Sequence, residues 1–201
     1  GAAAMLSIVI VNWNTRDLLV RCLLSIERSV VAEPLQTIVV DNASADESAI
    51  AAREQGLPML VVEPGRNAGY AAGNNLGFSR ASGDWVLALN PDTELEPECL
   101  QEALDAMGRH PDWGACGGML VGTNGHIQPS VRGFPTPVGF VGEALGLAKL
   151  LPRSAFGKYR MRDFDYTMEQ EAPQPMGTFL LFRRVALASV GDSCRPFDES
   201  F

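Results

Sequence analysis

The sequence contains no long hydrophobic run and no recognisable export signal. A bilayer-spanning helix needs about 20 consecutive apolar residues, and no run in this chain reaches that length. Residues 1–4 precede Met5 and resemble an expression scar rather than a signal peptide. These absences predict a soluble protein of the cytoplasm, with the inner face of the membrane as a further possible location.

Basic residues are few relative to acidic ones. Lys and Arg total 16 against 24 Asp and Glu, which gives a formal net charge of -8. Binding to a nucleic-acid backbone depends on clustered basic side chains that release counterions, so no nucleic-acid partner is expected. A small phosphorylated ligand remains compatible with this charge if a metal ion accompanies it.

Cysteine pairs, histidine clusters and common phosphate-binding fingerprints are also missing. The spacing of the cysteines and histidines matches neither a zinc site nor a redox pair, so we expect reduced thiols and no histidine-bound metal. There is no Gly-Lys-Ser/Thr sequence, and no Gly-x-Gly-x-x-Gly follows the first apolar run, which disfavours nucleoside triphosphatases and dehydrogenases. The isolated residues are Cys22, Cys99, Cys116, Cys194, His110 and His126.

Apolar runs alternate with amphipathic segments along the chain. This order predicts an α/β fold, a single Rossmann-like domain with a mostly parallel open sheet flanked by helices. Ser44 with Glu47 has the form of a capping box, and Pro97 suits a first helical position. Strands are expected at Leu6–Val11, Thr37–Val40, Met59–Glu63, Trp85–Leu89, Gly114–Val121 and Met176–Phe182, and helices at 18–26, 44–56, 71–81, 97–111, 138–151 and 185–190.

Polar residues follow four of the expected strands at the point where each strand ends. Because the carboxyl ends of parallel strands meet at one edge of a sheet, these side chains should gather at a single ligand-binding edge. They are Asn12, Asn14, Asp41, Asn42, Arg66, Asn67, Asn90, Asp92 and Glu94.

Two carboxylates of this set each have a binding and a structural interpretation. Asp41 could accept a hydrogen bond from an N–H of a pyrimidine base, or it could end its strand in an Asx turn. Asp92, with Asn90 and Glu94, offers the oxygen ligands that Mg2+ or Mn2+ accepts, or it could belong to an acidic helix start.

A glycine-rich stretch lies between the third and fourth expected strands. Gly65, Gly69, Gly73 and Gly77 alternate with asparagines and allow a ligand to approach the backbone closely. Tight packing of a helix through small residues explains the same pattern equally well.

Four segments occur in a characteristic order, and the family resemblance that they carry covers nearly the whole chain after Met5. They are Ile8-Val9-Ile10-Val11-Asn12-Trp13-Asn14, Val39-Val40-Asp41-Asn42-Ala43-Ser44, Asn67-Ala68-Gly69-Tyr70 through Gly73-Asn74-Asn75-Leu76-Gly77, and Leu89-Asn90-Pro91-Asp92-Thr93. Together they resemble the family 2 glycosyltransferases with the GT-A fold, and most closely their rhamnosyltransferase-like branch.

This resemblance implies a nucleotide-sugar-binding half at residues 5–121 and an acceptor-side segment at residues 122–201. Asp41 should contact the base, and Asn90 to Asp92 should occupy the place of the metal-binding Asp-x-Asp motif. Because Asn90 is a weaker ligand than Asp, Asp92 would carry the charge that holds Mg2+ or Mn2+. The implied nucleotide-binding residues are Val11, Asn12, Asn14, Asp41, Asn67, Gly69, Asn74 and Asn90.

The resemblance also implies inversion at the anomeric carbon by a carboxylate that takes the proton of the acceptor hydroxyl. Gly177–Arg184 and Phe197–Phe201 are similar to the segments that precede this carboxylate in the family. Asp198 and Glu199 are not the Glu-Asp motif that contains it. We therefore expect the chain to be truncated, with the general base beyond Phe201.

The leading hypothesis is a hexosyltransferase-type enzyme of cell-surface polysaccharide synthesis. Its donor would be a dTDP- or UDP-linked sugar, with rhamnose as one candidate, and its acceptor a glycan or a lipid-linked precursor. The alternatives are a sugar nucleotidyltransferase, which lacks its expected Gly-rich basic loop here, and a nucleotide-binding module without catalysis. Val138–Leu151 would pack in the core or between two subunits of a homodimer, or it would touch the membrane.

Overall fold

The computed structural model describes residues 4–132, 161 and 164–200. The chain divides into two compact units, one formed by Gly1–Cys116 with Gly177–Phe201 and the other by Gly117–Met176. The first unit therefore contains the C-terminal segment, which the sequence analysis grouped with residues 122–176. The expected helix at Val138–Leu151 lies outside the described residues.

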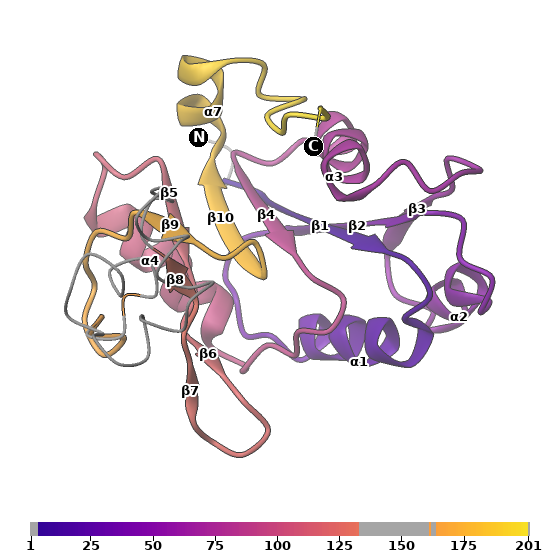
Figure 1. Cartoon of the computed structure of the whole chain (residues 1–201), viewed down its shortest axis with the longest axis horizontal. Coiled ribbons are helices and arrows are strands. Elements are labelled where there is room, and N and C mark those ends of the chain that lie inside the picture. Colours follow the sequence, from indigo (N-terminus) through magenta and orange to yellow (C-terminus); the bar gives the residue numbers. More distant parts are fainter. Residues whose placement is uncertain (1–3, 133–160, 162–163, 201) are drawn as a thin grey trace, which may run out of the picture. The chain divides into compact units, whose positions relative to one another are not determined.

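The first unit is built on a six-stranded sheet with the strand order β3-β2-β1-β4-β10-β5 (Figure 1). Strands β3, β2, β1 and β4 are parallel to one another, whereas β10 is antiparallel to β4. The expected α/β fold with a mostly parallel sheet is confirmed. The strands are β1 (Leu6–Asn12), β2 (Leu35–Asp41), β3 (Met59–Val62), β4 (Trp85–Leu89), β5 (Ala115–Gly117) and β10 (Phe179–Arg183).

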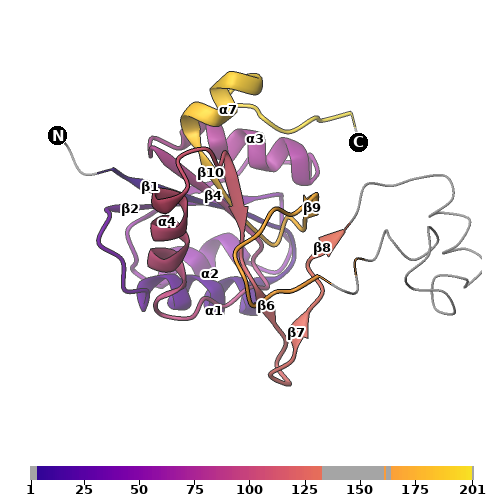
Figure 2. The ribbon, with the colours of Figure 1, turned by 90° about the vertical axis from the view of Figure 1, so that its left-hand side faces the viewer.

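Helices cover both faces of this sheet (Figures 1 and 2). One apolar cluster joins β1 to α1, α2 and α4, and a second cluster joins the opposite face to α3 and α7. Because β1 lies between two layers, the side chains of Ile8, Val9 and Ile10 have no exposed surface, as a continuous apolar run predicts. The helices are α1 (Arg16–Glu27), α2 (Ser48–Glu54), α3 (Tyr70–Arg80), α4 (Cys99–Arg109) and α7 (Arg184–Val190).

Two helix starts differ from the sequence prediction. The prediction of a capping box at Ser44 and Glu47 is wrong. Helix α2 begins at Ser48, and its N-cap residue, Glu47, makes no side-chain capping hydrogen bond. The Ser44 hydroxyl is instead bound to Asp41, and Glu47 adopts a left-handed conformation with φ 63°. Pro97 is not the first helical residue either, since α4 begins at Cys99 after Glu98.

The expected strand at Gly114–Val121 is interrupted in the structure. Its first part forms β5 at the end of the large sheet, whereas its second part forms β6 (Leu120–Val121) in a separate hairpin. The chain passes from the first unit to the second at Gly117, the last residue of β5. The expected strand at Met176–Phe182 is shifted to β10, because the backbone N–H of Met176 bonds to Ser130 in the second unit.

The described part of the second unit contains two short antiparallel pairs. Strand β6 pairs with β7 (Ile127–Gln128), and β8 (Val131–Arg132) pairs with β9 (Gln174–Pro175). The phenolic oxygen of Tyr166 accepts hydrogen bonds from the backbone N–H groups of Ser130 and Val131, at 2.9 and 3.0 Å.

Candidate functional site

The ends of three parallel strands bring the expected site residues to one edge of the sheet. In the pairing of β1 with β2, Asn12 stands opposite Asp41, and in the pairing of β1 with β4, Ile10 stands opposite Leu89. Asn90 directly follows Leu89, so it leaves β4 at nearly the same level as Asn12 leaves β1. Adjacent strands lie about 4.8 Å apart, which places all three ends within reach of one nucleotide-sized ligand.

Asp41 is held in a network of short hydrogen bonds. Its Oδ1 accepts from the amide of Asn12 at 2.8 Å and from the hydroxyl of Ser44 at 2.6 Å. Its Oδ2 accepts from the backbone N–H of Ser44 at 3.1 Å. The Asx-type turn weighed from the sequence is therefore present, and it coexists with a carboxylate that is only 3% exposed. The network fixes the orientation of Asp41 before any ligand arrives.

Asn12 and Asn14 extend the same network toward α1. Asn12 Oδ1 accepts a 2.6 Å hydrogen bond from the Thr15 hydroxyl, while the backbone N–H of Asn14 donates to Ser44 Oγ at 2.9 Å. Asn14 adopts φ 52°, and its side-chain oxygen accepts from the backbone N–H of Ala45 at 2.7 Å. These bonds tie the β1–α1 loop to the β2–α2 loop.

The glycine-rich stretch supports both of its interpretations at different positions. At Gly73 and Gly77, an added Cβ would lie 2.7 and 2.2 Å from side-chain atoms of Val11 and Val9, so α3 packs directly on β1 through these glycines. Gly69 has φ 87° and open space around it, and its backbone N–H donates to Asn67 Oδ1 at 2.9 Å. The loop before α3 is therefore the part that remains open to a ligand.

The side chain of Asn74, which the sequence analysis assigned to nucleotide binding, is buried and bonded within α3. It is 1% exposed, and its amide donates to the backbone carbonyl of Tyr70 at 3.0 Å within α3. Val11 is half-buried under Gly73. Both residues form the wall behind the open loop.

The expected metal-binding segment leaves β4 on an exposed loop. Asp92 and Glu94 are exposed, and Glu94 lies 3.7 Å from the guanidinium group of Arg21. Burial, together with the charges of Asp92 and Glu94, raises the pKa of the neighbouring Cys22 thiol to about 12. Within the residues that the structure describes, no group of three or more His, Cys, Asp or Glu side chains could hold a metal ion by itself.

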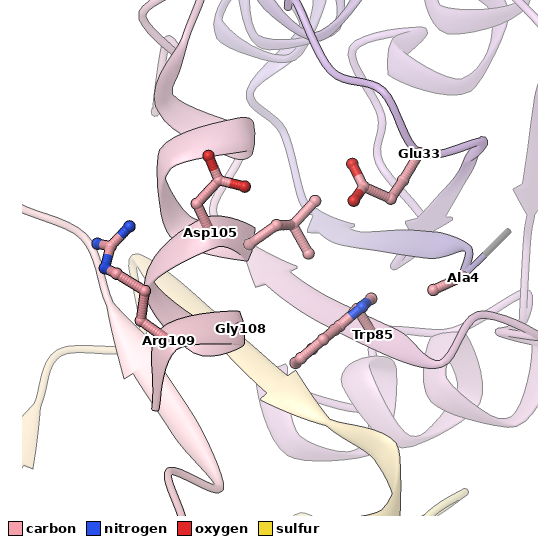
Figure 3. Close-up of a pocket in the computed structure, with 7 residues that line it drawn as sticks. Ala4, Glu33, Trp85, Asp105, Gly108 and Arg109 are labelled. Carbon is pink, nitrogen blue, oxygen red and sulfur yellow. The ribbon is translucent and has the colours of Figure 1, made fainter. Parts of the chain in front are cut away.

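A hollow of about 550 Å³ lies at the opposite ends of the strands (Figure 3). Ala4 and Trp85 line it, and they mark the amino ends of β1 and β4. Glu33 and Asp105 face the hollow from opposite sides. Its position separates it from the site at the carboxyl ends of the strands.

Comparison with known proteins assigns this chain to a family. The model of glycosyl transferase family 2 matches residues 7–190, which is most of the chain. The chain belongs to glycosyl transferase family 2. In the described part of this family 2 chain, no helix combines the length and the apolar character needed to cross a membrane.

Two curated relatives of this family 2 chain have described activities in their names. The N-acetylglucosaminyl-diphospho-decaprenol L-rhamnosyltransferase of Mycobacterium tuberculosis is 27% identical over 98% of this chain, which spans 66% of that relative's length. A low-salt glycan biosynthesis hexosyltransferase of Haloferax volcanii is 30% identical over 73% of this chain and 46% of its own length. The rhamnosyltransferase-like resemblance is thus confirmed.

Solved structures of two glycosyltransferases share the fold. The mannosyltransferase PcManGT of Pyrobaculum calidifontis, solved with GDP-Man and Mn2+, gives a TM-score of 0.59 at 20% identity over 94% of this chain and 47% of that chain. TarS of S. aureus gives 0.61 at 18% identity over 92% of this chain and 48% of that chain. These likenesses confirm the GT-A fold.

Two further residues lie beside the implied nucleotide-binding residues. Asn42 is 2% exposed, and its amide donates to the Gly69 carbonyl at 3.1 Å. Its Oδ1 is buried and has no hydrogen-bond partner among the described residues. Trp13 is 56% exposed beside Asn12, although large aromatic side chains are usually more buried. The sequence offered one usable signal for both, namely their position two residues after the last apolar residue of an expected strand.

Proposed function

We propose that this family 2 chain is the donor-binding part of an inverting enzyme that transfers a sugar from a nucleoside diphosphate. The donor is a UDP- or dTDP-linked hexose, with rhamnose as the leading candidate, and the acceptor is a glycan or a lipid-linked precursor of a cell-surface polysaccharide. The Asp41 network at the carboxyl edge of the sheet carries the proposal. The rhamnosyltransferase and hexosyltransferase activities named for the relatives support it.

The proposed base site consists of acceptor oxygens at the carboxyl end of β2, on Asp41 and on the residue that follows it, Asn42. A carboxylate oxygen has two lone pairs, and Oδ2 of Asp41 uses one of them for the Ser44 N–H. The buried Oδ1 of Asn42 has no partner. An unpaired buried acceptor is costly, so a ligand N–H that satisfies it would gain affinity. The imide N–H of uracil or thymine is such a donor. Trp13, which follows Asn12 in the chain, has an exposed ring that could contact the base.

The metal in this proposal is Mg2+ or Mn2+, held by Asp92. Magnesium in phosphate-transfer sites uses one or two carboxylates, with phosphate oxygens and water filling its remaining positions. Asp92 is exposed and fits that role, whereas the Glu94 carboxylate lies 3.7 Å from Arg21. The Thr93 hydroxyl oxygen is buried without a partner in the same loop, which leaves one further oxygen for the ion's water shell. The ion would stabilise the charge that develops on the leaving diphosphate.

The other expected nucleotide contacts would lie around Asp41 and Asp92. Asn12 and Asn14 would hold the β1–α1 loop, and the open backbone at Asn67 and Gly69 would approach the phosphates. The half-buried Asn90 would contact the nucleotide through its side chain. Asn74 would act from behind the loop, since its amide is used within α3.

Isothermal titration with UDP, dTDP and GDP, each with and without Mn2+, tests the proposal. We expect metal-dependent binding of UDP or dTDP that Asp92→Asn weakens at least tenfold. Asp84→Asn is the matched control, because Asp84 is equally exposed but lies just before β4 at the opposite edge. Equal binding by the two variants, or binding that ignores the metal, would remove Asp92 from the site.

The sugar nucleotidyltransferase alternative receives less support from the structure. The β1–α1 connection is formed by Trp13, Asn14 and Thr15, and the first basic residue, Arg16, lies 3.6 Å from Glu47. Release of pyrophosphate from a nucleoside triphosphate and a sugar phosphate would decide for this alternative. A binding module without catalysis would bind the nucleoside diphosphate as described. It would transfer no sugar, even as part of a longer chain.

A further inference from the structure

The β6–β7 hairpin of the second unit presents an apolar face to solvent. Met119 and Val121 are each 53% exposed, and Ile127 is 42% exposed. Val121 stands opposite Ile127 in the strand pairing, so their side chains lie on the same side of the hairpin. Met119 lies directly before β6, two residues from Val121. The hairpin and the residue beside it therefore expose three apolar side chains, which we call the patch.

Charge sets this hairpin apart from the rest of the chain. No Asp or Glu occurs between Asp112 and Glu143, and this is the longest acid-free stretch of a protein that carries 24 acidic residues. The hairpin itself contains His126 as its only titratable side chain. An acidic protein is repelled by an anionic lipid surface, and a segment without carboxylates is the part that can approach it.

The backbone of the hairpin tip is satisfied internally. The backbone N–H of Gly122 donates to the carbonyl of His126 at 2.8 Å, and that of Gly125 donates to Gly122 at 2.8 Å. The Asn124 side chain accepts from the N–H of His126 at 3.1 Å. Because unpaired backbone groups are costly in a lipid environment, a turn with these bonds can enter the interface at low cost.

We propose that the face formed by Met119, Val121 and Ile127 inserts into the interfacial layer of a phospholipid membrane. The inference rests on the lipid-linked acceptor of the proposed function, which gives the enzyme a reason to work at a membrane. A protein partner fits the face less well. A stable protein interface buries about 800 Å² on each side and uses aromatic or arginine anchors, whereas this patch has three aliphatic side chains.

Vesicle flotation of the whole chain with phosphatidylcholine vesicles tests this inference. The test variant is Met119→Gln with Val121→Thr and Ile127→Thr, which keeps β-branched residues in the strands. The control variant is Val30→Thr with Val185→Thr and Val190→Thr, because these three valines are 64%, 71% and 83% exposed in the first unit. We expect the wild type and the control to float alike. The partition coefficient of the hairpin variant into the vesicles should be about tenfold lower than that of the wild type.

A second readout detects insertion directly. In the V121W variant, brominated phospholipid should quench the fluorescence of the new tryptophan. In the V185W variant, it should leave the fluorescence of the new tryptophan unchanged. Adding phosphatidylglycerol should weaken binding at low salt, because the net charge is -8, and high salt should restore it.

Three results would overturn the inference. They are failure of the wild type to float, equal losses in the hairpin and control variants, and a hairpin variant that loses only concentration-dependent self-association. The last result would make the face a contact between two copies of the chain. Nucleotide titration of the hairpin variant separates this test from the proposed function, because donor binding should be unchanged whether or not the vesicles bind.

Discussion

The side-chain amide of Asn12 donates a 2.8 Å hydrogen bond to the carboxylate of Asp41, across the register position where the two residues face each other on β1 and β2. Both residues are buried, and the hydroxyl of Ser44 reaches the same carboxylate oxygen. The bond therefore serves the fold and the proposed base site at once. Changes at this point should affect stability and ligand affinity together.

Replacing Asp41 with Ala should lower the free energy of unfolding by about 2–3 kcal/mol, because three donor bonds lose their acceptor. Asp41→Asn keeps one acceptor oxygen and should cost about half as much. Urea unfolding followed by circular dichroism measures both values. Asp17→Ala, at an exposed carboxylate in the first turn of α1, is the control. An Asp41→Ala variant as stable as the control would contradict the described network.

Gly77→Ala should destabilise the protein by about 1–3 kcal/mol, because the new methyl group would meet Val9 Cγ1 at 2.2 Å. Gly108→Ala in α4 should instead be neutral or stabilising by up to about 1 kcal/mol, because nothing lies within 4 Å of its added Cβ. Thermal unfolding of both variants, and of Gly77→Ala combined with Val9→Ala, measures the effect. Partial recovery in the double variant is the expected sign of direct packing.

The C-terminal segment should loosen in acid. The Asn75 amide donates to Glu199 at 2.8 Å, and this bond, with the Arg195 guanidinium group, lowers the pKa of Glu199. A lowered carboxylate pKa means that the contribution is present above the ordinary pKa and disappears as the pH falls through the folded-state value. The same Asn75 accepts from the Phe197 N–H at 2.9 Å, so the amide resonance of Phe197 reports the change.

An NMR pH titration of that resonance is the measurement. The wild type should show a transition below the ordinary pKa of a glutamate, and Glu199→Gln should abolish the transition while keeping the Asn75–Phe197 bonds. If Glu199→Gln titrates like the wild type, another acid holds the segment.

Cys22 should resist alkylation in the folded protein. Burial, followed by the charges of Asp92 and Glu94, raises the pKa of its thiol to about 12, and only the thiolate reacts readily. At about pH 8, iodoacetamide should modify Cys22 only after denaturation, whereas the partly exposed Cys194 should react in the native state. Peptide mass spectrometry distinguishes the two sites. Rapid native labelling of Cys22 would mean that its side chain is not buried in the apolar cluster between α1 and the sheet.

The central strands could be predicted because their sequences have a single physical reading. Apart from Ser7, Leu6–Val11 and Trp85–Leu89 consist of apolar residues, and such runs are stable only when helices cover both faces of the sheet. The polar residues after them fall at the carboxyl edge for the same reason. The fold class, and the gathering of these polar residues at one edge of the sheet, therefore followed from local patterns.

The predictions that were wrong concern residues with two competing hydrogen-bonding or packing partners. Ser44 could cap a helix or bind Asp41, and the sequence does not say that the buried carboxylate wins. Gly114–Val121 is one apolar run, but its halves join different units. Nor does the motif reveal that Asn74 turns to its own helix while Asn42 keeps an unpaired oxygen. Such choices are made by tertiary contacts, which a local pattern does not contain.

The most direct test of the account is an amide NMR titration of this 21.6 kDa chain with UDP or dTDP, first with Mg2+ and then with Mn2+. The account predicts shifts at Asn12, Asp41 and Asn42 from the base, and paramagnetic broadening by Mn2+ that is strongest at Asp92 and reaches Asn90. Broadening centred on Glu33 and Asp105 at the opposite edge, or shifts that leave Asp41 and Asp92 unaffected, would contradict a shared donor site.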